Sequence, residues 1–330
     1  MNPPSDLAIH ATGLTKHFGG THAVDNLELA IPKGCVYGFL GPNGAGKTTT
    51  VRMLATLLRP DAGTASVLGL DTVRQAESVR ERIALTGQFA ALDQDLTGAE
   101  NLTVAARLLG YRPRAARIRA AELLSGFGLD DAAPRQVKTY SGGMRRRLDI
   151  AASLVATPEV LFLDEPTTGL DPASRNQVWA TIRALANAGT TVLLTTQYLA
   201  EADELASRVA VIDHGHLIAE GSPGELRAAG GTGRLRLRLA DAERRPDAAE
   251  LLHRLLGGSG SGSGSGSVEA AGSDPADVTV AVADAARATE AIAELSRGGI
   301  ALTGFSLDQP SLEEVFLALT TTAAPAAAAS

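Results

Sequence analysis

Eight consecutive residues near the N-terminus have the types and spacing that bind phosphate groups. The pattern G-x-x-x-x-G-K-[ST] is met at every fixed position by Gly41, Pro42, Asn43, Gly44, Ala45, Gly46, Lys47 and Thr48. Glycines let successive backbone N–H groups point into one concavity, and a helix start adds partial positive charge. Lys47 is expected to reach the terminal phosphates of a nucleotide, and Thr48 to offer its hydroxyl to Mg²⁺. The alternative is a glycine-rich turn that fits the pattern by chance.

Two carboxylates are the second candidate for chemistry. Asp164 and Glu165 directly follow the apolar run Val160–Leu163, which is typical of a buried strand. At the end of such a strand, Asp164 would hold Mg²⁺ directly or through water, and Glu165 would orient or deprotonate an attacking water. Structural carboxylates at a strand end are the alternative. A phosphate loop in the same chain favours the catalytic interpretation.

The segments around these residues predict an α/β core that would position them. Cys35–Leu40 is short and apolar, as a buried strand is, and Thr49–Leu58 has the apolar spacing of a helix. Strands are also predicted at Thr191–Thr196, which ends at Gln197, and from Arg208 into a turn. A strand, a glycine-rich turn and a helix start are the context that a true phosphate loop requires.

Between the two motifs the sequence predicts an all-helical insertion. Thr97 and Glu100 have the spacing of a capping box, and a helix follows them up to Gly110. Further helices are predicted at about 114–126 and 141–157, the last ending at a proline.

The segment before the phosphate loop offers one candidate contact for a nucleobase. Residues 7–37 are predicted to form short strands and turns, with Phe18 in a turn. An aromatic ring at this place could stack on adenine through its face, or could belong to the core. Position alone leaves both interpretations open.

Beyond about residue 230 the pattern becomes that of a small α+β domain. Arg234–Leu239 alternates strictly, which predicts a half-buried strand whose arginines face solvent. Ser311–Glu314 has the spacing of a second capping box, ahead of an amphipathic helix. Gly257–Ser267 is predicted to be a flexible loop, natural or engineered, and residues 321–330 a disordered tail.

Composition limits the class of function. The 330 residues allow two domains, and 45% hydrophobic with 20% charged residues is ordinary for a soluble protein. A net charge of −7 gives no overall basic field for nucleic acid. The one cysteine, Cys35, is interpreted as a buried small hydrophobe. With no signal-peptide features in residues 1–6 and no apolar run near ~20 residues, we expect a cytoplasmic protein whose membrane role comes through a partner.

The segment Tyr140–Arg147 contains the serine-glycine-glycine sequence that separates one family from other phosphate-loop proteins. With it, the chain closely resembles the ATP-binding subunit of an ABC transporter over about residues 7–228. The resemblance implies that Ser141, Gly142 and Gly143 bind the γ-phosphate of an ATP held by the opposite subunit, at a helix N-terminus. Two cassettes would then enclose two ATP molecules.

The resemblance also gives roles to residues without a motif of their own. Gln88 would be the lid glutamine that senses Mg²⁺ and water, and Asp171 would lie in the loop exchanged at the dimer interface. Phe18 would stack on adenine with Val24 beside it, and residues 89–95 would face the coupling helix of the membrane partner. The implied ATP-binding residues are Phe18, Val24, Gly41, Pro42, Asn43, Gly44, Ala45, Gly46, Lys47, Thr48, Thr49, Gln88, Ser141, Gly142, Gly143, Asp164 and Asp171. The implied catalytic residues are Lys47, Gln88, Glu165 and Gln197, and the implied Mg²⁺ ligands are Thr48, Gln88 and Asp164.

The architecture implied by the resemblance is an α/β fold, a P-loop NTPase cassette of the ABC type. It would have a RecA-like core, an antiparallel β subdomain and a helical subdomain at about residues 89–157. A C-terminal α+β accessory domain would follow at residues 229–320.

One position departs from the family pattern. The family usually has a histidine after the strand that ends at Thr196, whereas this chain has Gln197. An amide can donate a hydrogen bond to phosphate but cannot carry a proton or a positive charge. We expect phosphate contact to survive and any acid role to be lost, with slower hydrolysis as a hypothesis.

Three further segments, Gly87–Gly98, Thr195–Asp203 and Gln309–Thr320, look like the daunorubicin/doxorubicin-resistance branch of the family. Gln197 fits that branch too. The resemblance implies ATP and Mg²⁺ as cofactors, a separately encoded membrane permease, a homodimer of cassettes and a peripheral place on the cytoplasmic face of the membrane. It implies neither a nucleic-acid partner nor direct membrane insertion.

Two other functions are alternatives for a chain with these motifs. A soluble ABC protein acting on DNA or ribosomes would generally carry two cassettes or a DNA-binding insertion, and one cassette is present here. A regulatory binder that does not hydrolyse ATP would need damaged motifs, and only Gln197 favours it. The sequence leaves open which compound is exported and whether the cassette pairs with a copy of itself or with a sibling.

Overall fold

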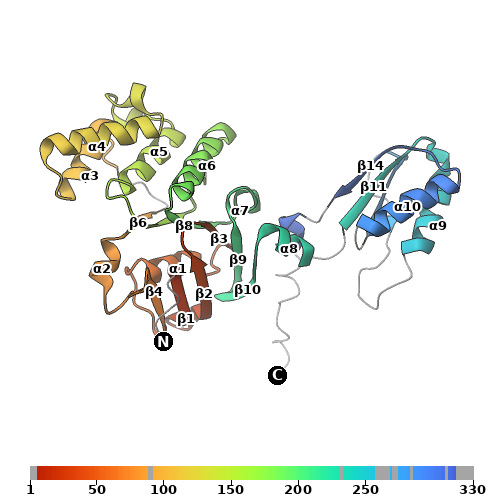
Figure 1. Ribbon diagram of the computed structural model, residues 1–330, viewed down its shortest axis with the longest axis horizontal. Helices are drawn as coiled ribbons and strands as arrows, with labels where there is room; N and C mark the ends of the chain where they lie inside the picture. The colour runs from red at the N-terminus through yellow and green to blue at the C-terminus, as the bar shows by residue number, and fades with distance from the viewer. Residues whose placement is uncertain are drawn as a thin grey trace. The chain divides into compact units, whose positions relative to one another are not determined.

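The computed structural model describes residues 6–87, 92–229, 233–256, 268–269, 274–282, 285–308 and 311–316. The chain divides into two units, Met1–Pro223 and Gly224–Ser330, each with its own sheet and core (Figure 1). The sequence placed this division between residues 228 and 229, which lie within helix α8 (Pro223–Ala229). Gln88, Gly257–Ser267 and residues 321–330 lie outside the described residues.

A largely parallel sheet organises the N-terminal unit, with the strand order β10-β9-β3-β8-β7-β6. Its strands are β3 (Val36–Leu40), β6 (Ile83–Thr86), β7 (Val160–Asp164), β8 (Thr191–Thr196), β9 (Arg208–Asp213) and β10 (His216–Gly221). Every residue of β3, β7 and β8 is buried, as expected for strands covered on both faces. These three strands pair in parallel, so their carboxyl ends meet at one edge, where open α/β sheets bind ligands.

A second, antiparallel sheet of the same unit has the order β2-β1-β4-β5. Its strands are β1 (Leu7–Phe18), β2 (Thr21–Pro32), β4 (Ala62–Val67) and β5 (Leu70–Asp71). The prediction of short strands was wrong here, because β1 and β2 each extend over 12 residues. Register shifts along the β1–β2 pair bend them while pairing continues. The predicted turn is present at Gly19 and Gly20, but Phe18 itself is the last residue of β1.

Helix α1 (Lys47–Leu54) follows the phosphate loop and joins the core shared with the antiparallel sheet. The sequence predicted a helix that continued to Leu58. It ends earlier because Thr56 adopts a left-handed backbone, with φ of 64°. Leu57 consequently faces outward and is 62% exposed.

The predicted helical insertion is present in the structure. It contains α3 (Gly98–Leu108), α4 (Pro113–Gly126), α5 (Gly142–Ser153) and two 3₁₀ turns, Asp130–Ala132 and Val137–Thr139. The capping box is confirmed, since Thr97 Oγ1 accepts from Glu100 N and the Glu100 carboxylate accepts from Thr97 N. These helices share a core with α6 (Pro172–Asn187) and the parallel sheet.

Two short helices complete the N-terminal unit: α2 (Ala76–Arg80) and α7 (Leu199–Leu205). Cys35 lies just before β3 and is half-buried, so its assignment to the buried strand was wrong. Its thiol donates to Pro32 O at 3.2 Å, and burial raises the pKa of the thiol. Among the described residues no helix is long and apolar enough to cross a membrane.

The C-terminal unit contains α8 and a sheet in the order β12-β13-β11-β14. Its elements are β11 (Gly233–Leu239), a 3₁₀ turn (Ala242–Arg244), α9 (Arg245–Leu256), β12 (Val268–Glu269), β13 (Asp277–Val282), α10 (Ala285–Arg297) and β14 (Leu302–Asp308). The leucines of β11 are buried against α9 and α10, and Arg236 and Arg238 are exposed as predicted. The second capping box is also confirmed by hydrogen bonds between Ser311 and Glu314.

Candidate nucleotide site

The phosphate loop spans the gap between β3 and α1, and its crest is exposed at Pro42, Asn43 and Gly44. Gly46 caps α1 with φ of 102°, a left-handed conformation that L side chains rarely adopt. A Cβ atom at Gly46 would lie 2.3 Å from Ala23 O, so the loop approaches β2 too closely for any other residue. Backbone close approach and an open crest are what a phosphate cradle needs.

The Lys47 side chain is folded back onto its own loop. Its ammonium group donates to Gly41 O at 2.7 Å and to Pro42 O at 3.0 Å, and the residue is only 5% exposed. Burial lowers the pKa of Lys47, while the negative charges of Glu165 and Asp164 oppose this shift. A cation is therefore held beside the loop crest, close to two carboxylates.

Asp164 is the meeting point of three elements. The Thr48 hydroxyl, from α1, donates to Asp164 Oδ2 at 2.9 Å, and the Thr195 hydroxyl, from β8, donates to Asp164 Oδ1. Asp164 itself ends β7 and is 7% exposed. Carboxylate and hydroxyl oxygens are the ligands that Mg²⁺ prefers, so this pair fits the metal that accompanies nucleotide phosphates.

Glu165 has an unusual backbone. Its φ of 47° is left-handed, which costs of order 1 kcal/mol or more for a residue with a side chain. The conformation is held from β8, because Glu165 N donates to Thr195 O at 3.1 Å and to Thr195 Oγ1 at 3.2 Å. The Thr168 hydroxyl donates to Glu165 Oε2 at 3.2 Å. Thr195 therefore holds the Asp164 carboxylate and the Glu165 backbone, a role that sequence reasoning missed.

The serine-glycine-glycine segment starts α5. Ser141 is exposed and its hydroxyl accepts from Met144 N at 3.2 Å as the helix cap. A Cβ atom at Gly143 would lie 2.2 Å from Ser174 Oγ, so α6 packs closely against this helix start.

Asp171 caps α6 beside that segment. Its carboxylate accepts from Ser174 N at 2.9 Å and from the Ser174 hydroxyl at 2.6 Å. These bonds lower the pKa of Asp171, the side-chain bond from Ser174 contributing most. Ser174 thus joins the loop of Asp171 to the segment that begins at Ser141.

Arg146 is a further residue of α5 that the sequence analysis did not single out. It is 9% exposed, and its guanidinium donates to Pro166 O at 2.9 Å, Asp164 O at 3.2 Å and Gly87 O at 2.7 Å. It also pairs with Asp149 at 3.2 Å. Burial lowers the pKa of Arg146, opposed by the neighbouring acidic groups. The helical insertion is tied in this way to the chain just before Gln88 and to the loop after β7.

A second buried network lies behind the same edge. The Glu201 carboxylate, on α7, accepts from the Thr167 hydroxyl at 2.9 Å and from Trp179 Nε1 at 3.1 Å. Glu201 is 1% exposed, and burial raises its pKa. Trp179 lies on α6, so the Glu201 carboxylate joins α6 to α7.

The remaining predicted residues have diverse surroundings. Gln197 directly follows β8 and is half-buried, so it lies at the same edge as Asp164.

Phe18 is 52% exposed, which excludes the core interpretation of this ring, and Lys16 Nζ lies 5.7 Å from its centroid. Val24 is 1% exposed and packs beside Gly46, beneath the loop. His214 and His216 are exposed, and the described residues contain no cluster of ligands for a metal ion.

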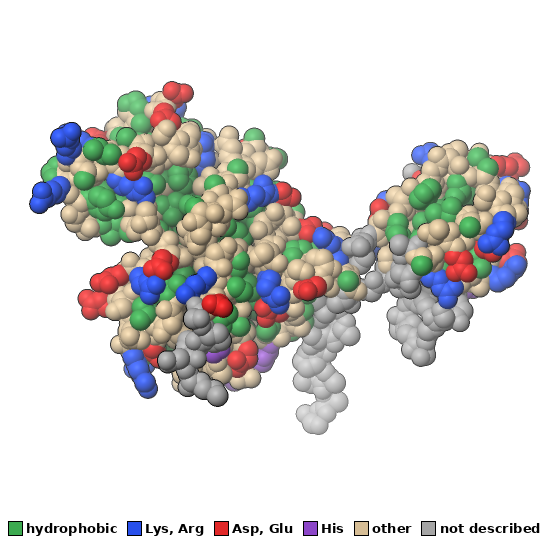
Figure 2. Space-filling view, viewed as in Figure 1, with side chains coloured by type: hydrophobic (Ala, Val, Ile, Leu, Met, Phe, Trp, Pro, Cys, Tyr) green, Lys and Arg blue, Asp and Glu red, His purple; other side chains and the backbone are tan. Residues whose placement is uncertain are grey.

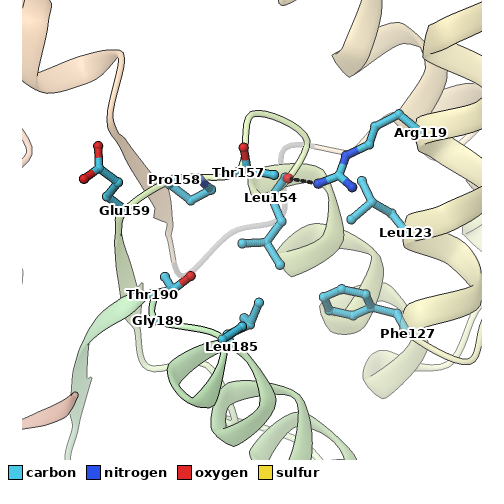
Figure 3. A pocket seen from close by; sticks show the side chains of 11 residues that line it. Arg119, Leu123, Phe127, Leu154, Thr157, Pro158, Glu159, Leu185, Gly189 and Thr190 are labelled. Atoms are coloured by element: carbon cyan, nitrogen blue, oxygen red, sulfur yellow. Dashed lines mark hydrogen bonds between the residues drawn. The ribbon is translucent and has the colours of Figure 1, made fainter. Parts of the chain in front are cut away.

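A pocket of about 440 Å³ lies away from all of these residues, near the start of β7 and of β8 (Figure 3). Leu123, Phe127, Leu154 and Leu185 give it a mainly apolar wall, and Arg119 donates from its rim to Leu154 O at 2.9 Å. The motif residues gather instead at the carboxyl ends of these strands. The pocket is therefore not the candidate nucleotide site.

A phosphate loop on a parallel sheet, an antiparallel sheet and a helical insertion together define a P-loop NTPase of the ABC cassette type. Comparison with known proteins agrees: the ABC transporter family profile matches residues 24–168. The chain is 58% identical over 320 residues to the daunorubicin/doxorubicin resistance ATP-binding protein DrrA of Streptomyces peucetius, covering 97% of this chain and 94% of that protein. The chain belongs to the family of ABC transporter ATP-binding proteins, and it is an ATP-binding ATPase.

Other relatives and solved structures support the same family. The Nod factor export ATP-binding protein I of Ralstonia nicotianae is 45% identical, over 65% of this chain and 67% of that protein. The structure of cbiO1 from Clostridium perfringens, part of the ABC transporter complex cbiONQ, has a TM-score of 0.63 at 26% identity, covering 68% of this chain and 91% of that chain. A dimeric post-hydrolysis cassette with bound ADP and Pi has a TM-score of 0.59 at 25% identity, covering 65% of this chain and 98% of that chain.

Proposed function

We propose that the chain hydrolyses ATP to drive a separately encoded membrane permease that exports hydrophobic drugs, antibiotics or related natural products. The observation that carries hydrolysis is the meeting of Thr48, Asp164 and Glu165 at one sheet edge. The direction of transport and the class of cargo rest on the similarity to a daunorubicin/doxorubicin resistance protein over 97% of the chain.

In this proposal the phosphate loop binds the nucleotide mainly through its backbone. The N–H groups of residues 44–49 hold the phosphates. The Lys47 ammonium gives up its hydrogen bonds to the carbonyls of Gly41 and Pro42 and donates to the terminal phosphate instead. Such an exchange is favourable because a phosphate carries full negative charge and a carbonyl does not. The half-exposed ring of Phe18 stacks on adenine, with Val24 supporting the loop from below.

The Thr48 hydroxyl and the Asp164 carboxylate would hold Mg²⁺, with Gln88 as a further ligand. When bound, Mg²⁺ neutralises charge on the phosphate oxygens. Glu165 orients the attacking water and accepts its proton, and its backbone is already fixed by Thr195. The carboxyl edge of the sheet therefore presents the Lys47 cation, the metal-binding oxygens of Thr48 and Asp164, and the Glu165 base. Strand β7 does not need to rearrange.

A second copy of the chain completes the site. Ser141, Gly142 and Gly143 of one cassette contact the γ-phosphate held by the other, and Asp171 lies in the exchanged loop. The exposure of Ser141, Gly142 and Asp171 supports this role, because they are open to a partner. ATP then performs work because it binds the closed dimer more tightly than the open one. Hydrolysis returns the dimer to the open state.

Gln197 lies where the family usually has histidine. Its amide donates to the γ-phosphate but cannot act as an acid, so hydrolysis is slower than with histidine. Comparison of ATPase rates for the wild type and Gln197→His tests this point, and equal rates would contradict it.

We place the chain on the cytoplasmic face of the membrane, bound to the permease and without nucleic acid. The C-terminal unit serves as an accessory domain for this assembly. Its separate sheet and core support independence from the nucleotide site.

The proposed function is tested by Mg²⁺-dependent ATPase activity of the full chain, with and without its co-expressed membrane protein in lipid. We expect stimulation by the membrane protein and further stimulation by an exported drug. Glu165→Gln should lose turnover but keep ATP binding, and should accumulate as an ATP-bound dimer. Lys47→Ala should lose nucleotide affinity.

Glu159→Gln is the matched control for Glu165→Gln. Glu159 directly precedes β7 at its opposite end and pairs on the surface with Arg82, so its loss should leave turnover unchanged. ATPase activity indifferent to any membrane protein would favour a soluble ABC role on ribosomes or DNA. Unchanged turnover in Glu165→Gln would remove that residue from catalysis.

A further inference from the structure

The turn that joins α3 to α4 carries a concentrated positive charge on an acidic protein. Arg107, Arg112, Arg114, Arg117 and Arg119 lie within 13 consecutive residues, and residues 101–121 contain no Asp or Glu. The whole chain has a net charge of −7. Figure 2 shows Lys and Arg side chains gathered at this end of the helical insertion. We call the α3–α4 turn, with residues 104–118, the hairpin tip.

Three of these arginines have no structural task in the described part of the chain. Arg112, Arg114 and Arg117 are exposed, and no hydrogen bond or ion pair joins their guanidinium groups to the described residues. The other two are engaged, since Arg107 donates to Tyr111 O and Arg119 donates to Leu154 O. Exposed arginines elsewhere often pair, as Arg236 does with Asp308 and Arg254 with Glu250. The hairpin tip therefore presents uncompensated charge to the outside.

Large apolar side chains share this surface. Leu108 is 83% exposed, Leu109 54%, Ile118 52% and Val104 46%. Val104 and Leu108 are four residues apart on α3, so they lie on one helix face. Exposed leucines beside unpaired arginines are typical of an interaction surface.

We propose that the hairpin tip docks on the headgroup region of an anionic lipid bilayer. Guanidinium groups would contact lipid phosphates, and Leu108, Leu109 and Ile118 would enter the boundary between headgroups and acyl chains. Two signals of this kind, basic charge and apolar side chains, are what stable peripheral binding requires. An acidic protein partner would match the charge, but it would also have to supply an apolar groove for the protruding leucines, whereas the bilayer boundary accepts them directly.

This inference rests on the proposed function only in placing the chain beside a membrane, where a transporter subunit works. It departs from the expectation that any membrane role comes only through the permease. Direct docking would fix the distance between the helical insertion and the bilayer that contains the permease. The nucleotide residues lie in other segments, so lipid binding and ATPase activity can be measured separately.

The test is co-sedimentation of the full chain with vesicles, without permease. We expect binding to phosphatidylglycerol/phosphatidylcholine vesicles, weak binding to pure phosphatidylcholine, and weakening of the former by salt. Each surface arginine is worth about fivefold in affinity. The variant Arg112→Ala/Arg114→Ala/Arg117→Ala should therefore bind about 100-fold more weakly. Leu108→Ser/Ile118→Ser should release the protein at lower salt than the wild type does.

The matched control removes three exposed arginines from the C-terminal unit: Arg254→Ala/Arg287→Ala/Arg297→Ala. It has the same net charge as the test variant and should bind vesicles as the wild type does. Equal losses in both triple variants, wild-type binding by the test variant, or no preference for anionic lipid would overturn the proposal. Binding of the hairpin tip to single-stranded RNA with no binding to vesicles would also overturn it. Solution ATPase activity of each variant reports separately on the proposed function.

Discussion

The Thr48 hydroxyl donates a 2.9 Å hydrogen bond to Asp164 Oδ2, joining two residues that lie 116 positions apart in the sequence. The Thr195 hydroxyl donates a hydrogen bond to the other carboxylate oxygen of Asp164, Oδ1. Asp164 is consequently held between α1 and β8, at the edge where β3, β7 and β8 end. The candidate hydrolysis site is thus an assembly of three chain segments, and each contributes a group that the others orient.

Asp164→Asn should weaken the contacts of this side chain with Thr48, Thr195 and Mg²⁺, while the side chain keeps its size and shape. An amide offers one acceptor oxygen where the carboxylate offers two, and it carries no charge for Mg²⁺. We expect a fall in Mg²⁺-dependent ATPase activity of about 100-fold or more. Asp213→Asn, at the end of β9 in the same sheet, is the control and should retain activity. Comparable activity in the Asp164 and Asp213 variants would show that Asp164 has no role with the metal.

The left-handed backbone at Glu165 predicts a stability effect that is separate from catalysis. Asn tolerates this conformation, whereas a β-branched residue does not. Glu165→Asn should unfold in urea at nearly the wild-type midpoint, and Glu165→Val should lose about 1–3 kcal/mol of unfolding free energy. Both should lack turnover. If the two variants are equally stable, the backbone at this position is not strained.

Arg146 should be far more important for stability than its neighbour Arg145. Loss of its guanidinium leaves the carbonyls of Gly87, Asp164 and Pro166 without their donor, and leaves Asp149 without its cation. Arg146→Met should therefore cost about 2–4 kcal/mol of unfolding free energy. Arg145→Met, one residue earlier on the same helix, should cost well under 1 kcal/mol. Thermal unfolding of both variants measures the difference, and similar midpoints would contradict the prediction.

Glu201 predicts a pH dependence of stability. Burial raises its pKa in the folded state, so between the unfolded and folded pKa values the folded protein binds more protons than the unfolded chain. Stability contributed by this group is therefore present at acid pH and falls as pH rises through the raised pKa. Glu201→Gln keeps an acceptor for Thr167 and Trp179 but cannot ionise. Urea unfolding across pH should show wild type losing stability relative to Glu201→Gln as pH rises; a gain would refute the assignment.

Local patterns in the sequence predicted much of the fold. The phosphate loop, the capping boxes at Thr97 and Ser311, the apolar strand before Asp164 and the alternating strand at Arg234–Leu239 are each specified within a few residues. Neighbouring residues are enough to fix them, since turn geometry, helix capping and strand alternation are short-range effects. Errors arose where distant pairing overrides local cues, as in the long strands β1 and β2.

The sequence by itself therefore determined the family of the chain and predicted which residues carry the chemistry. Tertiary structure alone decided how they are held: Thr195 between the Asp164 carboxylate and the Glu165 backbone N–H, Arg146 across three backbone carbonyls, and Glu201 beneath Thr167. It also decided that Phe18 faces outward and that three free arginines share a surface with Leu108. Burial and hydrogen-bond partners of these side chains depend on segments far apart in the chain, and no local pattern encodes them.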